Sequence, residues 1–177
     1  MKYLVTLGLI SLLALSACDQ IQVKPDCDGS RLQVVEFETV DLQAHFGDSC
    51  FVYAQMPLES NWIIRSDAEY ASFDSVLQQN WTADNTNPGP DCLGYSLPQI
   101  DFSTYTLLIA GSAASGCSAG ELEHKIFECE AAEEYTVVST MQETGLCQAY
   151  WVLTDWILVK NLDPDYAIKF SQGQEAE

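Results

Sequence analysis

Basic side chains and histidines are scarce in this chain. Its 177 residues include 7 Lys and Arg against 26 Asp and Glu, together with 2 His, and its formal net charge at pH 7 is −19. A protein with this charge repels phosphate backbones and anionic lipid headgroups, which excludes nucleic acid and direct lipid recognition as functions. The acids are scattered along the chain, which favours a highly soluble surface over an acidic patch that binds cations or a basic partner.

Long apolar runs are also absent, except at the amino end. Lys2 precedes an almost unbroken apolar run from Leu4 to Leu15, and Ser16-Ala17-Cys18 follows. These are the parts of a secretory signal peptide, and the run is shorter than the ~20 residues of a membrane-spanning helix. Leu15-Ser16-Ala17-Cys18 resembles the lipobox of bacterial lipoproteins. The resemblance implies cleavage before Cys18, diacylation of its thiol and acylation of the new amino terminus; the alternative is an ordinary signal peptide that ends in a cysteine.

Cleavage would remove 17 of the 177 residues and leave 160, which is the length of one domain. Loss of Lys2 takes the formal charge from −19 to −20. We expect four segments: a signal peptide at residues 1–17, a lipidated spacer at 18–31, a single β-rich domain at 32–170 and a disordered tail at 171–177.

The cysteine count indicates disulfides. The chain has seven: Cys18, Cys27, Cys50, Cys92, Cys117, Cys129 and Cys147. Lipidation of Cys18 leaves six, an even number in an oxidising compartment, which allows 15 pairings. No Cys-x-x-Cys pair occurs and only His45 and His124 offer imidazoles, so we expect no structural zinc site and no cofactor.

Strand-like segments outnumber helical ones. They are Leu32–Val40, Cys50–Met56, Trp62–Arg65, Tyr105–Ala110, Glu121–Cys129, Glu134–Met141, Gln148–Lys160 and a short edge strand at Ala167–Phe170. Short connections predict that the segments beginning at Glu121, Glu134 and Gln148 form an antiparallel meander. The predicted fold is mainly β (α+β): a curved antiparallel sheet or small sandwich with one packed helix, stapled by disulfides.

One long helix is predicted from Ser66 to Asn80. Ser66 and Glu69 fit a capping box, and apolar residues recur at helical spacing from Tyr70 to Leu77. Residues 82–91 read as a loop dense in turn formers, without the spacing of a calcium loop.

The meander predicts one disulfide. Cys117 precedes the strand at Glu121 and Cys147 precedes the strand at Gln148, so both would lie at one end of the sheet. We therefore predict the pair Cys117–Cys147, with Cys27, Cys50, Cys92 and Cys129 forming two further bridges.

No residue pattern predicts catalysis. Residues 111–118 have the glycine spacing of a phosphate-binding loop but lack its lysine, so we expect a flexible link between strands. Ser112 and Ser115 lack a Gly-x-Ser-x-Gly setting. His124 is expected to be hydrogen-bonded at the sheet surface, and a Ser-His-Asp site assembled from distant residues stays open. Asp155 interrupts an apolar strand; it indicates a bulge or an exposed edge, or else a functional acid.

Tryptophans offer the remaining candidate site. Trp62, Trp151 and Trp156 could form an exposed aromatic platform for a sugar or peptide, although packing in the core explains most of them. Tyr150 and Trp156 share one strand face and Trp151 lies on the other.

The order of elements resembles a known family. Ile63–Tyr70 is a strand leading into a capped helix, and Pro98–Ser103 precedes the strand Tyr105–Ala110. This arrangement is similar to the small β-rich domain of PrcB-like lipoproteins, named for a subunit that stabilises a surface protease complex, and to uncharacterised lipoproteins of Bacteroidota. Where that family tends to have a Gly-Gly-aromatic turn, this chain has Gly116-Cys117-Ser118.

Three functions follow as hypotheses. The first is a non-enzymatic cell-envelope lipoprotein, anchored at Cys18, that binds another protein such as an envelope protease or a surface assembly. The second is a carbohydrate- or nutrient-binding lipoprotein, and the third is an envelope hydrolase. Inner and outer membrane are both open.

Overall fold

The computed structural model describes Pro25, Cys27 and residues 32–47, 61–83, 95–160 and 162–173. Its elements are β1 (Leu32–Val35), β2 (Phe37–Thr39), α1 (Leu42–Phe46), β3 (Trp62–Ile64), α3 (Asp67–Ala83), β4 (Tyr105–Ser115), β5 (Leu122–Cys129), the 3-10 turn η2 (Glu130–Ala132), β6 (Glu134–Met141), β7 (Tyr150–Lys160) and β8 (Ala167–Gly173).

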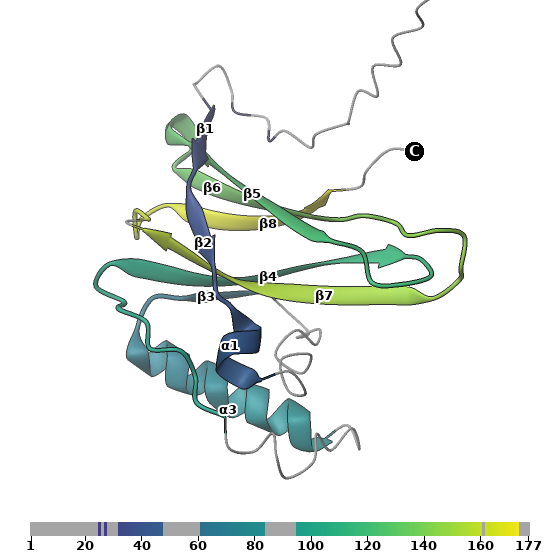
Figure 1. Ribbon diagram of the computed structural model, residues 1–177. Coiled ribbons are helices and arrows are strands. Elements are labelled where there is room, and N and C mark those ends of the chain that lie inside the picture. The colour runs from purple at the N-terminus through teal and green to yellow at the C-terminus, as the bar shows by residue number, and fades with distance from the viewer. Residues whose placement is uncertain are drawn as a thin grey trace, which may run out of the picture.

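The strands form two packed sheets, so the predicted sandwich is confirmed. Sheet A has the order β1-β5-β6-β8 and sheet B the order β2-β7-β4-β3. All neighbours are antiparallel except β6 and β8, which run parallel. Helix α3 covers the face of sheet B that points away from sheet A, which gives three layers (Figure 1).

Two hydrophobic clusters hold these layers together, and β4 contributes alternate side chains to each of them. Leu107 and Ile109 join the cluster that contains Phe73 of α3, whereas Leu108 and Ala110 join the cluster between the sheets. Successive side chains of a strand point to opposite faces. A strand buried on both faces is therefore apolar at nearly every position, as β4 and β7 are.

The long helix begins at the predicted cap, Ser66, but one bond of the capping box and the end of the helix differ from the prediction. The Ser66 hydroxyl accepts a hydrogen bond from the Glu69 N–H at 3.3 Å. The Glu69 carboxylate reaches back to the N–H of Arg65 at 2.6 Å rather than to that of Ser66, so the reciprocal half of the capping box is shifted by one residue. Helix α3 continues to Ala83, three residues past the predicted end at Asn80.

The predicted meander is wrong in its third strand. β5 and β6 form the expected antiparallel hairpin, but β7 leaves sheet A and pairs with β2 and β4 in sheet B. The run from Trp151 to Val159 is apolar on both faces, and only a position between two layers buries both. Similarly, the segment Leu32–Val40 is two strands, because the chain passes from sheet A to sheet B at Glu36.

Residues 111–118 are not the predicted flexible link. Strand β4 continues through Ser115, paired with β7 along its full length. A Cβ atom on Gly111 would lie 2.6 Å from the Leu153 carbonyl oxygen, so this position needs glycine for the close approach of β7.

Strand β8 extends the domain beyond its predicted end. It continues through Gly173, so residues 171–173 belong to the edge of sheet A and not to a disordered tail. The predicted signal peptide, Cys18, the candidate strand Cys50–Met56 and most of the predicted loop at 82–91 lie outside the described residues; Thr82 and Ala83 belong to α3.

Two disulfides are present among the described residues. Cys117–Cys147 forms as predicted, with Cα atoms 4.7 Å apart, and Cys27–Cys129 joins the spacer to the end of β5, with Cα atoms 5.8 Å apart. The reason for this pairing differs from the predicted one, because the two cysteines are brought together by the β4–β7 pair and not by a meander. Cys117 lies two residues past β4 and Cys147 three residues before β7, and the two strands pair as Ser115 opposite Tyr150. Cys50 and Cys92 lie outside the described residues.

Candidate functional site

Three places in the described residues carry polar chemistry or exposed apolar side chains. They are a buried cluster between the sheets, a hollow beside α3, and the end of the sandwich at the Cys117–Cys147 disulfide.

The buried cluster joins His124, Ser139 and Asp155. His124 Nδ1 lies 3.0 Å from the Ser139 hydroxyl, and His124 Nε2 lies 3.2 Å from a carboxylate oxygen of Asp155. An imidazole protonated on Nε2 donates to the carboxylate and accepts from the hydroxyl, which satisfies both nitrogens. The histidine and serine come from sheet A and the aspartate from sheet B, so the cluster is a polar bridge across the sandwich interior.

This cluster corrects two expectations. His124 does not lie at the sheet surface, because its side chain is 2% exposed. Asp155 is neither on an edge nor at a bulge: β7 lies between β2 and β4, and its pairing with β4 runs without interruption through Ala110 opposite Asp155.

The residue types match a Ser-His-Asp site, but their burial does not suit one. Ser139 is 2% exposed and lies in the packed space between the sheets, where an acyl substrate has no access to its hydroxyl. Neither serine considered from the sequence takes this place: Ser112 is buried within β4 and Ser115 is exposed at its end. His45 is exposed on α1.

Sequence reasoning missed Ser139, although the hairpin contained the signal. The four-residue connection between Cys129 and Glu134 sets these two residues opposite each other, and counting back along the ladder puts His124 opposite Ser139. The hydrogen bond between His124 and Asp155 could not be inferred from the sequence, because it depends on β7 lying in the other sheet.

The hollow beside α3 has a volume of about 390 Å³ and is lined by Asp67, Tyr70, Ala71, Asp74 and residues 97–100. Two of its polar groups, the Tyr70 hydroxyl and the Asp74 carboxylate, have partners. The Tyr70 hydroxyl donates to the Pro98 carbonyl at 3.1 Å, and the Tyr95 hydroxyl donates to Asp74. Burial, with the nearby Asp74 carboxylate, raises the pKa of both tyrosines. The Tyr70 hydroxyl is therefore held neutral and hydrogen-bonded, which does not suit a nucleophile.

The third place is an apolar end of the sandwich, here called the stapled tip: residues 116–118 and 144–151. Leu146 is 99% exposed, Tyr150 72% and Trp151 37%. These are three of the four large hydrophobic side chains exposed among the described residues, and the fourth is Val34 on edge strand β1.

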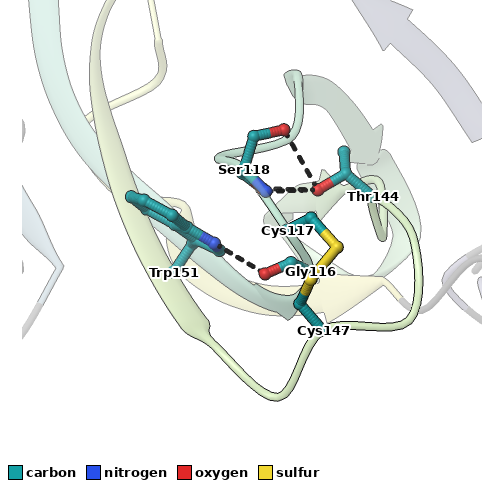
Figure 2. The surroundings of a disulfide bond; sticks show 6 residues. All are labelled: Gly116, Cys117, Ser118, Thr144, Cys147 and Trp151. Carbon is teal, nitrogen blue, oxygen red and sulfur yellow. Dashed lines mark hydrogen bonds between the residues drawn. A yellow bond between two sulfur atoms is a disulfide. The ribbon is translucent and has the colours of Figure 1, made fainter.

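Several bonds fix the stapled tip, as Figure 2 shows. The disulfide joins Cys117 to Cys147, and the Trp151 indole N–H donates to the Gly116 carbonyl at 3.0 Å. The Thr144 hydroxyl bonds both the N–H and the carbonyl of Ser118.

Glycine permits this close packing. A Cβ atom on Gly116 would lie 2.3 Å from the Thr144 hydroxyl oxygen and 2.8 Å from the Thr144 nitrogen. Gly145 has a φ of +75°, in the left-handed region that favours glycine. The exposed side chains therefore project from a fixed backbone.

The three tryptophans of the proposed platform do not share an exposed face. Trp156 is fully buried in the cluster under α3, and Trp62 packs edge-on against Phe73 in the same cluster. Trp151 lies at the stapled tip, on the opposite face of β7 from Trp156.

Comparison with known proteins gives no relative: no protein-family model, no curated protein and no solved structure matches the chain. In the part of the chain that the structure describes, no helix is long and apolar enough to cross a membrane, and no group of three or more His, Cys, Asp or Glu is placed to hold a metal ion.

Proposed function

We propose that this protein is a lipid-anchored module of the bacterial cell envelope that binds another protein through the stapled tip, and that it is not an enzyme. The observation that carries the proposal is the exposure of Leu146, Tyr150 and Trp151 within six residues of one fixed segment. Clustered apolar side chains on a soluble surface are typical of interaction sites. Tyrosine and tryptophan are also the residues that most often dominate binding energy at protein interfaces.

The fixed backbone of the tip supports this function. Binding costs free energy when loops and side chains become ordered, and a preorganised segment avoids part of that cost. The disulfide and the hydrogen bonds to Gly116 and Ser118 hold the segment before any partner arrives. Burial of Leu146 against a partner would then contribute about 2 kcal/mol.

Charge indicates the chemistry of the partner. The chain has a formal charge of −19, and Glu121 and Glu143 are exposed beside the tip. The fitting partner therefore has an apolar pocket with basic side chains around it, because complementary charge speeds association and excludes wrong partners. The resemblance to PrcB-like lipoproteins favours an envelope protease complex or a surface assembly.

The other two hypotheses have weaker support. Carbohydrate capture needs a shared aromatic face, and Trp156 is buried. Hydrolysis needs an accessible nucleophile, and Ser139 is buried beside His124.

The test is capture of envelope proteins from the source cell by the full-length lipoprotein and two variants. In the first, Leu146→Asp and Tyr150→Asp replace the two most exposed apolar side chains of the tip without touching its disulfide. In the matched control, Val34→Asp changes a side chain on β1 that is as exposed as Tyr150, 72% in both cases. We expect the tip variant to lose the captured protein and the Val34 variant to retain it. Equal capture by both variants would contradict the proposal.

A further inference from the structure

The two described disulfides lie at opposite ends of the sandwich. Cys129 is the last residue of β5, at the turn of the β5–β6 hairpin. The stapled tip lies beyond the other end of that hairpin, where the Gln142 N–H donates to the Glu121 carbonyl at 3.3 Å. The eight residues of β5 separate the two ends by ~25 Å. Figure 1 shows the hairpin turn beside β1 at one end and the β6–β7 connection at the other.

The Cys27–Cys129 disulfide sets the length of the tether between the lipid anchor and the domain. Eight residues separate Cys18 from Cys27, and the nine Cα–Cα steps between the two cysteines span at most about 30 Å. Without the disulfide the tether would run on to Leu32 at the start of β1, and the fourteen Cα–Cα steps from Cys18 to Leu32, with thirteen residues between them, span at most about 48 Å. Leu32 lies opposite Cys129 in the β1–β5 ladder, so the tether meets the domain at the end remote from the stapled tip in either case, and the disulfide shortens it.

Charge keeps both ends of the domain out of an anionic leaflet, since Glu130 and Glu133 are exposed at the hairpin turn, so the attachment of the tether and not charge decides which end lies nearer the bilayer. Glu121 and Glu143 flank the tip and are exposed, and an anionic leaflet would repel them over about 8 Å at physiological ionic strength. The apolar tip is therefore better suited to a protein surface than to the membrane that holds the anchor.

We propose that the domain stands on its membrane with the hairpin turn near the bilayer and the stapled tip away from it, and that the Cys27–Cys129 disulfide strengthens this orientation by shortening the tether. The inference rests on the proposed lipid anchor at Cys18 and on the proposed binding role of the tip. It adds that the partner reaches the tip from the aqueous side, and not as a protein embedded beside the anchor in the same membrane.

Energy transfer to a headgroup acceptor in vesicles tests this orientation. The mature lipidated protein carries one donor dye, attached through an unnatural amino acid at either of two exposed positions: Ala131 in the hairpin turn or Gln148 in the stapled tip. We expect more efficient transfer from Ala131, with Gln148 farther from the bilayer by ~25 Å. Equal transfer from the two positions, or more efficient transfer from Gln148, would overturn the proposal.

A variant without the disulfide tests its part in the orientation. Cys27→Ser with Cys129→Ser leaves neither cysteine of this bridge as an unpaired thiol and lengthens the tether from eight residues to thirteen, so the difference in transfer between the two positions should shrink. A folded variant that keeps the full difference would show that the disulfide does not strengthen the orientation. If circular dichroism shows that the variant does not fold, the comparison of the two positions in the parent protein decides.

These outcomes are distinct from failure of the proposed function. A protein that has the proposed orientation but binds no partner through Leu146 and Tyr150 would refute the proposed function and leave the orientation intact. A protein that binds through those residues while Gln148 lies nearer the bilayer than Ala131 would refute the orientation and leave the proposed function intact.

Discussion

Removing the Asp155 carboxylate should destabilise the domain, because it leaves His124 Nε2 without its acceptor inside the sandwich. The two side chains are 2% and 18% exposed, so water has little access to replace the lost hydrogen bond. A buried polar group that loses its partner costs about 1–3 kcal/mol, and a charged one about 3–5 kcal/mol. For Asp155→Ala we therefore expect the free energy of unfolding to fall by at least about 1 kcal/mol.

Urea unfolding followed by tryptophan fluorescence measures this change, since Trp156 lies in the core. The midpoint should fall while the slope with urea stays constant, which identifies a change in stability. The matched control is Asp165→Ala, an exposed aspartate whose loss should change stability by less than ~0.5 kcal/mol. Similar midpoints for the two variants would refute the reasoning.

Replacing the whole cluster separates the cost of an unpaired group from the value of the cluster. The triple variant His124→Leu, Ser139→Ala and Asp155→Leu removes donors and acceptors together, and such replacements are often nearly neutral. We expect it to be more stable than Asp155→Ala alone. A triple variant that loses the sum of the three single costs would show that the residues do not act as one unit.

Four further predictions test other parts of the chain. Ser66→Ala should cost ~1 kcal/mol of stability in urea unfolding, because the Glu69 N–H loses its acceptor at the start of α3; no loss would argue against this cap. Cys18→Ser should abolish labelling with palmitate and move the protein into the aqueous phase of a detergent separation, and equal labelling of variant and parent would exclude the anchor. With Cys18 lipidated and two bridges assigned, the remaining pair is Cys50–Cys92, and a peptide joining either cysteine to another partner in non-reducing mapping would contradict this elimination. Burial raises the pKa of Tyr70. The contribution of Tyr70 to stability is therefore complete below the unfolded pKa near 10 and is lost as pH rises through the folded pKa. An ultraviolet titration in which every tyrosine ionises together near 10 would refute the raised pKa.

The parts of the fold that depend on local pattern were predictable from the sequence. The cap at Ser66, the apolar face from Tyr70 to Leu77 and the β5–β6 hairpin all rest on residues close together in the chain, and the structure contains each of them. The Cys117–Cys147 disulfide was also predicted, although from a strand order that is wrong.

The parts that depend on distant strands were not predictable in the same way. Asp155 reads from sequence as a break in an apolar strand, because nothing nearby shows that His124 of the other sheet faces it. The exposure of Leu146 was missed for a similar reason. An apolar residue in a connection carries no periodicity, and only the assembled end of the sandwich shows that nothing in the described residues covers it.

Photo-crosslinking in intact cells tests the central claim, binding through the stapled tip, most directly. A photoreactive amino acid replaces Leu146 in the full-length lipoprotein, and the same amino acid replaces Val34 in a control that keeps the tip intact. The account predicts one discrete protein adduct from position 146 and none from position 34. Adducts with lipid alone from position 146, or the same protein adduct from both positions, would contradict it.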